Sequence, residues 1–309
     1  MLRFSNAVSA IVTVCCASFL FAETQYPLTI LDGMGQEITV KKAPKTISSK
    51  TLFTDEILLS MLDKQQISSL TNLASEVTYS NIATIIPENM PLLDLNVEAI
   101  IGNYPDLVFA ANWSDAGKIE QIKQAGIPVY LVNTPFTVED IQAEIIKLGY
   151  ILNAEQGAAD VVAQMNSQLM SYQTLVNDIK AQNWVALDYN TWGTSSGVDT
   201  TWQAVLDNSG IINGSAAYEQ GAFGQVAMSK ELIIEVDPDI LFLPGWIYGE
   251  DGAAKAFYQQ VIADPALSNV KAIKNGRVYQ IPENLRGTYS QYLADTVGYV
   301  VNSVHASIN

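Results

Sequence analysis

Short apolar runs alternate with amphipathic stretches along most of the chain. The runs at 106–110 and 127–133 are each followed by a stretch with apolar residues at helical spacing, at 114–126 and 137–152. Buried parallel strands are continuous apolar runs in sequence, and the helices that connect them are amphipathic. The pattern therefore predicts an α/β fold with mostly parallel strands covered by helices on both faces.

The pattern of strands and helices extends to the start and to the second half of the chain. Residues 28–40 alternate around Asp32-Gly33, which predicts a β-hairpin. After residue 181 the alternation of strands and helices resumes, with an apolar strand at 239–245 and a final helix over about 288–306. The second half of the chain is therefore expected to repeat the architecture of the first.

A long helical segment separates the two halves. Residues 154–181 carry apolar side chains at helical spacing, among them Val161, Met165 and Val176, and contain no proline. Such a rod is about 40 Å long, more than a crossover helix needs. We expect an N-terminal lobe over 23–153, a linking helix over 154–181 and a C-terminal lobe over 182–309.

The two halves also share a motif. Residues 96–110 and 229–243 both contain E-x-I-I-x-x-x-P-D-[LI]-[VL]-F at a constant offset. A weaker echo follows at an apolar strand of each half, marked by Gly126, Val129 and Tyr130 in the first and by Gly276, Val278 and Tyr279 in the second. The repeat favours two related lobes; the alternative is one α/β domain with a chance repeat.

The first 22 residues have the features of a signal peptide. Arg3 is their only charge, an apolar run follows, and Ala22 precedes a polar start. We expect cleavage after Ala22 and a periplasmic protein; an uncleaved anchor and a lipid anchor on Cys15 or Cys16 are the alternatives. Both cysteines lie in this segment, so the mature chain would have no disulfide.

Charge excludes some partners. The net charge is −16, and removing Arg3 with the signal peptide leaves 15 basic against 32 acidic residues, or −17. A nucleic acid or an anionic membrane requires a positive surface. We therefore expect neither as a partner.

The order of these patterns resembles that of a known family. The hairpin with D-G-x-G, T-D-E-I-L, N-V-E-A-I-I before P-D-L-V, the long helix, S-K-E-L-I-I before D-P-D-I-L, and N-G-R-V-Y-Q-I-P occur in this order. Together they resemble the class III periplasmic substrate-binding proteins of ABC importers, over nearly all of the mature chain. The resemblance implies two lobes joined by a rigid helix, with a ligand cleft between them.

The same resemblance implies a function. The ligand would be a ferric siderophore, or else cobalamin or haem, and the protein would deliver it as a monomer to a permease dimer. It would perform no catalysis and would need no cofactor. Such a protein flexes by small rotations of its lobes.

Glu98 and Glu231 hold matching places at the start of the repeated motif. Asn96 and Ser229 are candidate N-caps, so each glutamate is expected in a first helical turn, where the helix dipole favours an acid by about 0.3–1 kcal/mol. That local effect alone would explain a glutamate at either position. The resemblance implies instead that the pair docks onto the permease.

Loops at the carboxyl ends of the predicted strands are rich in aromatic residues, which predicts a wide cleft for a bulky chelate. The candidate ligand contacts are Lys50, Phe53, Trp113, Trp192, Phe223, Trp246, Tyr248 and Arg286. Packing inside a lobe is the alternative for each ring. Trp184 and Trp202 are assigned to the core, because they lie within a strand and a helix.

Arg286 is one of two arginines in the mature chain, and a guanidinium can bind a ligand oxygen bidentately. Lys50 is a weaker basic candidate. This scarcity of bases disfavours a tris-catecholate and fits a less charged ferric hydroxamate or a corrinoid better. With His305 as the single histidine, no direct metal site is expected, and haem would need a tyrosine such as Tyr79, Tyr248 or Tyr289.

One enzymatic alternative remains. Residues 193–197 match G-x-S-x-G with Ser195 at the centre, which is typical of serine hydrolases, and His305 follows later in the chain. The next helix, however, begins several residues after the serine, whereas a nucleophile elbow places its serine at the turn. A loop of small residues at the cleft is the simpler interpretation.

Overall fold

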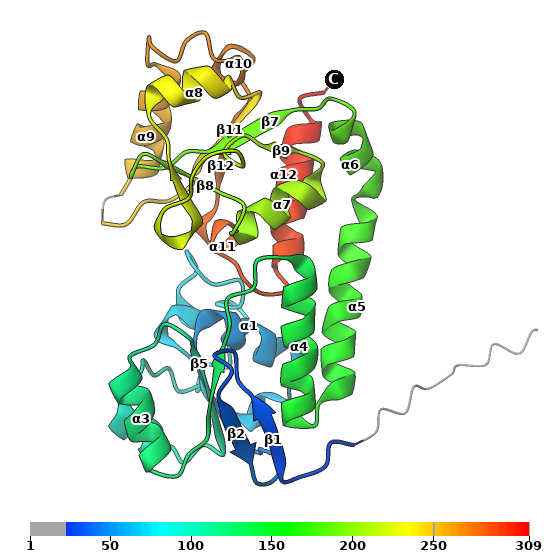
Figure 1. The fold of residues 1–309 in the computed structure, drawn as a ribbon, viewed down its shortest axis with the longest axis vertical. Coiled ribbons are helices and arrows are strands. Elements are labelled where there is room, and N and C mark those ends of the chain that lie inside the picture. The colour runs from blue at the N-terminus through cyan, green and yellow to red at the C-terminus, as the bar shows by residue number, and fades with distance from the viewer. Residues whose placement is uncertain (1–22, 250, 309) are drawn as a thin grey trace, which may run out of the picture.

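The computed structural model describes residues 23–249 and 251–308. The predicted signal peptide, 1–22, lies outside the described residues. Figure 1 shows two lobes, one above the other, with long helices running along one side of both. No helix in the described ranges has the length and apolar character to cross a membrane.

The N-terminal lobe is built on four parallel strands in the order β4-β3-β5-β6. Their bounds are β3 (Ile47–Lys50), β4 (Ile67–Ser69), β5 (Leu107–Ala111) and β6 (Val129–Val132). The helices are α1 (Leu52–Met61), α2 (Val97–Gly102), α3 (Ala116–Gln124) and α4 (Val138–Leu152), with short 3-10 turns η1 (Lys64–Gln66) and η2 (Asn72–Ser75). Strand β5 is buried along its whole length, as its continuous apolar run predicts.

The C-terminal lobe has a sheet of four parallel strands in the order β12-β11-β7-β9 and a small antiparallel pair, β8 with β10. The strands are β7 (Val185–Asp188), β8 (Thr194–Ser196), β9 (Ile212–Asn213), β10 (Gln225–Ala227), β11 (Ile240–Pro244) and β12 (Val278–Ile281). The helical elements are α7 (Thr201–Ser209), η3 (Ala222–Gly224), α8 (Lys230–Val236), α9 (Ala253–Ile262), α10 (Lys271–Lys274), α11 (Glu283–Arg286) and α12 (Leu293–His305).

The two main sheets have the same topology. If β7, β9, β11 and β12 are matched to β3, β4, β5 and β6, the strand orders are identical. The echo in the sequence corresponds to strand pairing, since Phe109 lies opposite Tyr130 and Phe242 lies opposite Tyr279. The prediction of two related lobes is confirmed.

The repeated aspartate has a structural role in both lobes. Asp106 accepts a hydrogen bond from the backbone N–H of Thr46 at 3.2 Å, and Asp239 accepts one from Val185 at 3.0 Å. Each carboxylate thus joins the start of one strand to the start of its neighbour. The residue before each Pro-Asp, Tyr104 or Asp237, is in the left-handed conformation, which ends the preceding helix.

The predicted hairpin is confirmed as β1 (Leu28–Leu31) paired with β2 (Glu37–Val40). Its turn docks on the N-terminal sheet, where the backbone N–H of Gly33 donates to the carbonyl of Leu131 at 2.6 Å. A Cβ at this position would collide with the backbone around Asn133. The tight D-G turn therefore fixes the hairpin to the end of β6.

The predicted linking helix is present as two segments, α5 (Glu155–Ser171) and α6 (Gln173–Lys180), with Tyr172 between them. At this point the N–H of Tyr172 bonds to the carbonyl of Leu169, a tighter i→i−3 turn. The Tyr172 ring lies against Gly298 of α12, where a side chain would collide with it. In Figure 1 this pair of helices runs along both lobes, with α4 and α12 beside it.

Candidate ligand-binding cleft

Two adjoining cavities lie where the lobes meet. One, of about 340 Å³, is lined mainly by the N-terminal lobe, and the other, of about 570 Å³, mainly by the C-terminal lobe. They share four lining residues, Trp113, Thr134, Gly287 and Tyr289. The two cavities therefore form one cleft, bounded by loops at the carboxyl ends of β3, β5 and β6 and by the segment between α11 and α12.

Five of the eight predicted ligand contacts line this cleft. They are Lys50 and Phe53 on the N-terminal side, Phe223 and Arg286 on the C-terminal side, and Trp113 between them. Phe223 is notable because its backbone is left-handed (φ 57°) and its side chain is 94% exposed. A bulky residue held in this conformation at a cavity edge is typical of a functional position.

The other three predicted contacts lie outside the lining of both cavities. Trp192 is 82% exposed in the turn after β7, and Tyr248 is 85% exposed after β11. Trp246 packs edge-on against Tyr79 across the lobe boundary, with ring centroids 5.2 Å apart. Position after a strand was therefore not sufficient to predict which residues line the cleft.

Lys50 lines the cleft but its ammonium is committed to the protein. It donates to the carbonyl of Leu93 at 2.9 Å and to the hydroxyl of Ser69 at 3.1 Å. Burial lowers the pKa of Lys50 to about 8, although the charges of Asp55 and Asp94 oppose this shift. The lysine therefore acts first as an internal donor that ties β3 to neighbouring loops.

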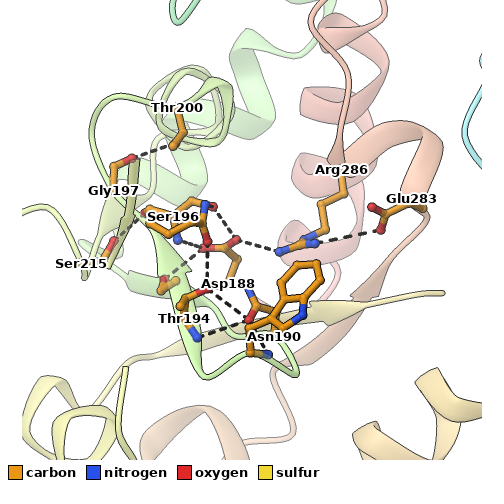
Figure 2. Close-up of polar contacts among 12 residues, drawn as sticks. Asp188, Asn190, Thr194, Ser196, Gly197, Thr200, Ser215, Glu283 and Arg286 are labelled. Atoms are coloured by element: carbon orange, nitrogen blue, oxygen red, sulfur yellow. Dashed lines mark hydrogen bonds and ion pairs between the residues drawn. The ribbon is translucent and has the colours of Figure 1, made fainter. Parts of the chain in front are cut away.

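Arg286 is also paired, as Figure 2 shows. Its guanidinium lies 3.4 Å from the Asp188 carboxylate and 4.0 Å from that of Glu283. Burial raises the pKa of Glu283, and Arg286 opposes this. The arginine predicted as a ligand contact is thus paired with two carboxyl groups of the cleft and offsets one of their two negative charges.

Asp188 is the centre of this polar network. It is buried at the end of β7 and accepts hydrogen bonds from the hydroxyls of Ser195 at 2.9 Å and Ser196 at 2.8 Å, and from the Ser196 N–H at 2.7 Å. These bonds attach β8 to the main sheet. Asp188 was not predicted from the sequence, where its place at the end of the V-A-L-D strand was the available signal.

Ser195 is not placed as a nucleophile. It lies within β8, is fully buried and donates to a carboxylate, whereas a nucleophile elbow exposes its serine at a strand–helix turn. His305 instead contacts Asp178 at 3.0 Å. The hydrolase interpretation has no geometric support.

Two further residues that were not predicted as ligand contacts line the cleft. Tyr289 lines both cavities but was named only as one of several tyrosines able to bind haem. Trp202, assigned to the core, is 3% exposed and packs against Phe242, yet it also lines the larger cavity. Its indole N–H has no hydrogen-bond partner among the described residues.

Glu56 of the N-terminal lobe connects the cleft to the segment between α11 and α12. Its buried carboxylate accepts from the N–H and the side-chain amide of Asn81 at 3.0 and 2.9 Å, and from the hydroxyl of Ser290. Asn81 in turn exchanges two hydrogen bonds with Asn284 of α11. Burial raises the pKa of Glu56 to about 7.

Glu98 and Glu231 occupy matching places on the outside of the two lobes. Both are exposed in the first turn of α2 and α8, where Asn96 and Ser229 accept the N-cap hydrogen bonds that the sequence predicts. A hydrogen bond from its own backbone N–H holds the pKa of Glu231 below its usual range. Two equivalent negative side chains are thus presented by the two lobes.

The fold and the cleft define a two-lobed solute-binding protein. The profile of the periplasmic binding protein family matches residues 47–285, and the chain belongs to this family, in its class III. It is 29% identical to the uncharacterized ABC transporter substrate-binding lipoprotein YvrC of Bacillus subtilis, over 91% of this chain and 86% of the relative.

Other relatives are more distant. A cobalamin-binding protein of Halobacterium salinarum is 20% identical over 91% of this chain and 74% of its own length. The crystal structure of a possible iron-binding (periplasmic solute-binding) protein from Staphylococcus epidermidis superposes with a TM-score of 0.71 at 17% identity, covering 85% of this chain and 99% of that one. The structural likeness confirms the predicted two-lobed fold.

Proposed function

We propose that this protein is the solute-binding component of an ABC importer and that it captures a metal chelate, a ferric siderophore first among them. The observation that carries the proposal is the cleft between the lobes, with Trp113, Phe223 and Tyr289 around it. Its two cavities have the size of typical small-molecule sites. Aromatic rings supply a large apolar contact area at low entropic cost.

Cobalamin or haem is the alternative ligand within the same function. The cobalamin-binding relative from Halobacterium supports the first. Tyr289 is placed to approach a haem, since it lines both cavities. The protein would hold any of these ligands without chemical change, in the periplasm and as a monomer.

The visible spectrum of the protein distinguishes these ligands. The protein purified from its native host, or exposed separately to a ferric hydroxamate, a corrinoid and haem, is expected to retain one chromophore after gel filtration. Retention of none of the three would contradict the proposed function.

Delivery would use Glu98 and Glu231 as docking residues for the two halves of the permease. A two-fold partner can bind both lobes at once because each lobe presents the same charge at the same place. We expect Glu98→Gln together with Glu231→Gln to abolish uptake while ligand affinity stays unchanged.

Glu139 offers a matched control, because it is an exposed glutamate in the first turn of α4. Glu139→Gln should leave both uptake and affinity intact. Loss of ligand affinity in the docking double variant, or equal loss of uptake in the control, would show that the glutamates are misassigned.

A further inference from the structure

The charges that line the cleft are unbalanced. Among the described residues that line the two cavities, Lys50 and Arg286 are the basic ones. Five carboxyl groups line the same surface, namely Glu56, Asp94, Asp188, Asp199 and Glu283. Acids therefore exceed bases by three, or by two when Glu56 is protonated.

Neither base offers an uncompensated positive charge. Arg286 lies between Asp188 and Glu283, and the Lys50 ammonium is bonded to Ser69 and to a backbone carbonyl of Leu93. Asp188 and Glu283 offset the charge of Arg286, and the nearby charges of Asp55 and Asp94 act on Lys50, so an anionic ligand entering the cleft would meet bases whose fields are already offset. It would gain little from them and would be repelled by the remaining acids.

The remaining acids are positioned to act on a ligand. Asp94 and Asp199 are exposed, one on the wall of each cavity. Asp199 accepts one side-chain hydrogen bond, from Gln220 at 3.2 Å. Both stay accessible to a bound cationic group, and a cleft with low-dielectric walls concentrates their field.

We propose that the cleft selects chelates of zero or positive net charge and discriminates against anionic ones. The inference rests on the proposed function and adds the charge class of the ligand to it. Two or three net charges at about 10 Å in a dielectric near 80 change the affinity for one ligand charge by about four- to eightfold before screening by salt.

The test uses ligands that differ in charge at one remote group. The ferric complex of a linear tris-hydroxamate with a terminal amine carries +1; acetylation of the amine makes it neutral, and succinylation makes it −1. A neutral corrinoid and its monocarboxylate derivative form a second set. Affinities are measured by quenching of tryptophan fluorescence at 20 mM and 300 mM NaCl.

The expected result is that the neutral hydroxamate binds about fourfold more tightly than the anionic one in 20 mM salt, and the cationic one more tightly still, with smaller ratios in 300 mM salt. Asp94→Asn with Asp199→Asn should reduce the neutral-to-anionic ratio to about twofold or less, whereas Glu139→Gln should not change it. Both substituted aspartates are exposed, so the variant is expected to fold.

The outcomes separate the two proposals. Equal affinities across a set that binds, or preference for its anionic member, would overturn the charge inference while the proposed function stands. Failure of both sets to bind while haem, whose propionates are anionic, is retained would overturn the charge inference alone. Failure of both sets and of haem would overturn the proposed function, and the inference with it.

Discussion

The pairing of Arg286 with Asp188 makes a direct prediction about stability. Arg286→Gln removes the cation that lies 3.4 Å from one buried carboxylate and 4.0 Å from the partly buried Glu283. The variant leaves both acids in place beside a cavity. We therefore expect a less stable protein rather than one that only loses ligand.

The size of the effect follows from the surroundings of Asp188. Removing one partner of a fully buried ion pair costs about 3–5 kcal/mol. Asp188, however, keeps three hydrogen bonds from Ser195 and Ser196. Arg286 itself is partly exposed to the cavity. We therefore expect a loss of about 2 kcal/mol in the free energy of unfolding at pH 7.

The loss should depend on pH through Glu283. Its folded pKa is raised by burial, so its charged form disfavours the folded state at neutral pH, and Arg286 opposes this. Without the arginine the folded pKa rises further. The stability deficit of the variant should be largest above this pKa and should shrink as the pH falls through it.

Urea denaturation at pH 5 and pH 7.5 measures these effects. Arg277→Gln is the matched control, since Arg277 stacks on Trp184 at 4.2 Å and forms no ion pair among the described residues. Asp188→Asn combined with Arg286→Gln should be less destabilised than the sum of the single variants, by about 1–2 kcal/mol. Additive losses, or a loss no larger than in the control, would refute the ion pair.

Three other predictions concern the cleft and the join between the lobes. Trp113→Ala should weaken chelate binding by about 1–3 kcal/mol, because its ring lies between both cavities. Trp192→Ala should change the same affinity by less than about 0.5 kcal/mol, since this residue lies outside their lining; equal losses in a titration would contradict the described cleft. The pKa of Glu56 is about 7 in the folded protein, above its value in the unfolded chain. Its protonated form therefore stabilises the fold at pH values below the unfolded pKa. This contribution, up to about 3 kcal/mol, is lost as the pH rises to about 7. Glu56→Gln should flatten this part of the pH profile in urea denaturation, and an unchanged slope would argue against the buried carboxyl.

Local features of the fold were predictable because short stretches of sequence encode them. The hairpin at Asp32-Gly33, the N-caps at Asn96 and Ser229, and most strand and helix positions depend on neighbours within a few residues. The internal repeat predicted the two lobes because equal sequence produced equal topology. The break at Tyr172 was not predictable in this way, since the ring packs on a helix more than a hundred residues later.

The residues that line the cleft are instead brought together by contacts between positions that are far apart in the chain. Asp188 and Arg286 are 98 residues apart, and Glu56 and Ser290 are 234 apart. The sequence placed aromatic residues after strands, yet Trp113 lines the cleft while Trp192 does not.

By itself, then, the sequence determined two α/β lobes, the helical connection and the outward glutamates, because these follow from local periodicity and from an internal repeat. The tertiary structure alone decided which side chains line the cleft, that Arg286 is ion-paired there, and that Lys50 is hydrogen-bonded to neutral groups of the protein. The reason is that relative lobe placement results from many weak packing contacts, and no single stretch of sequence encodes them.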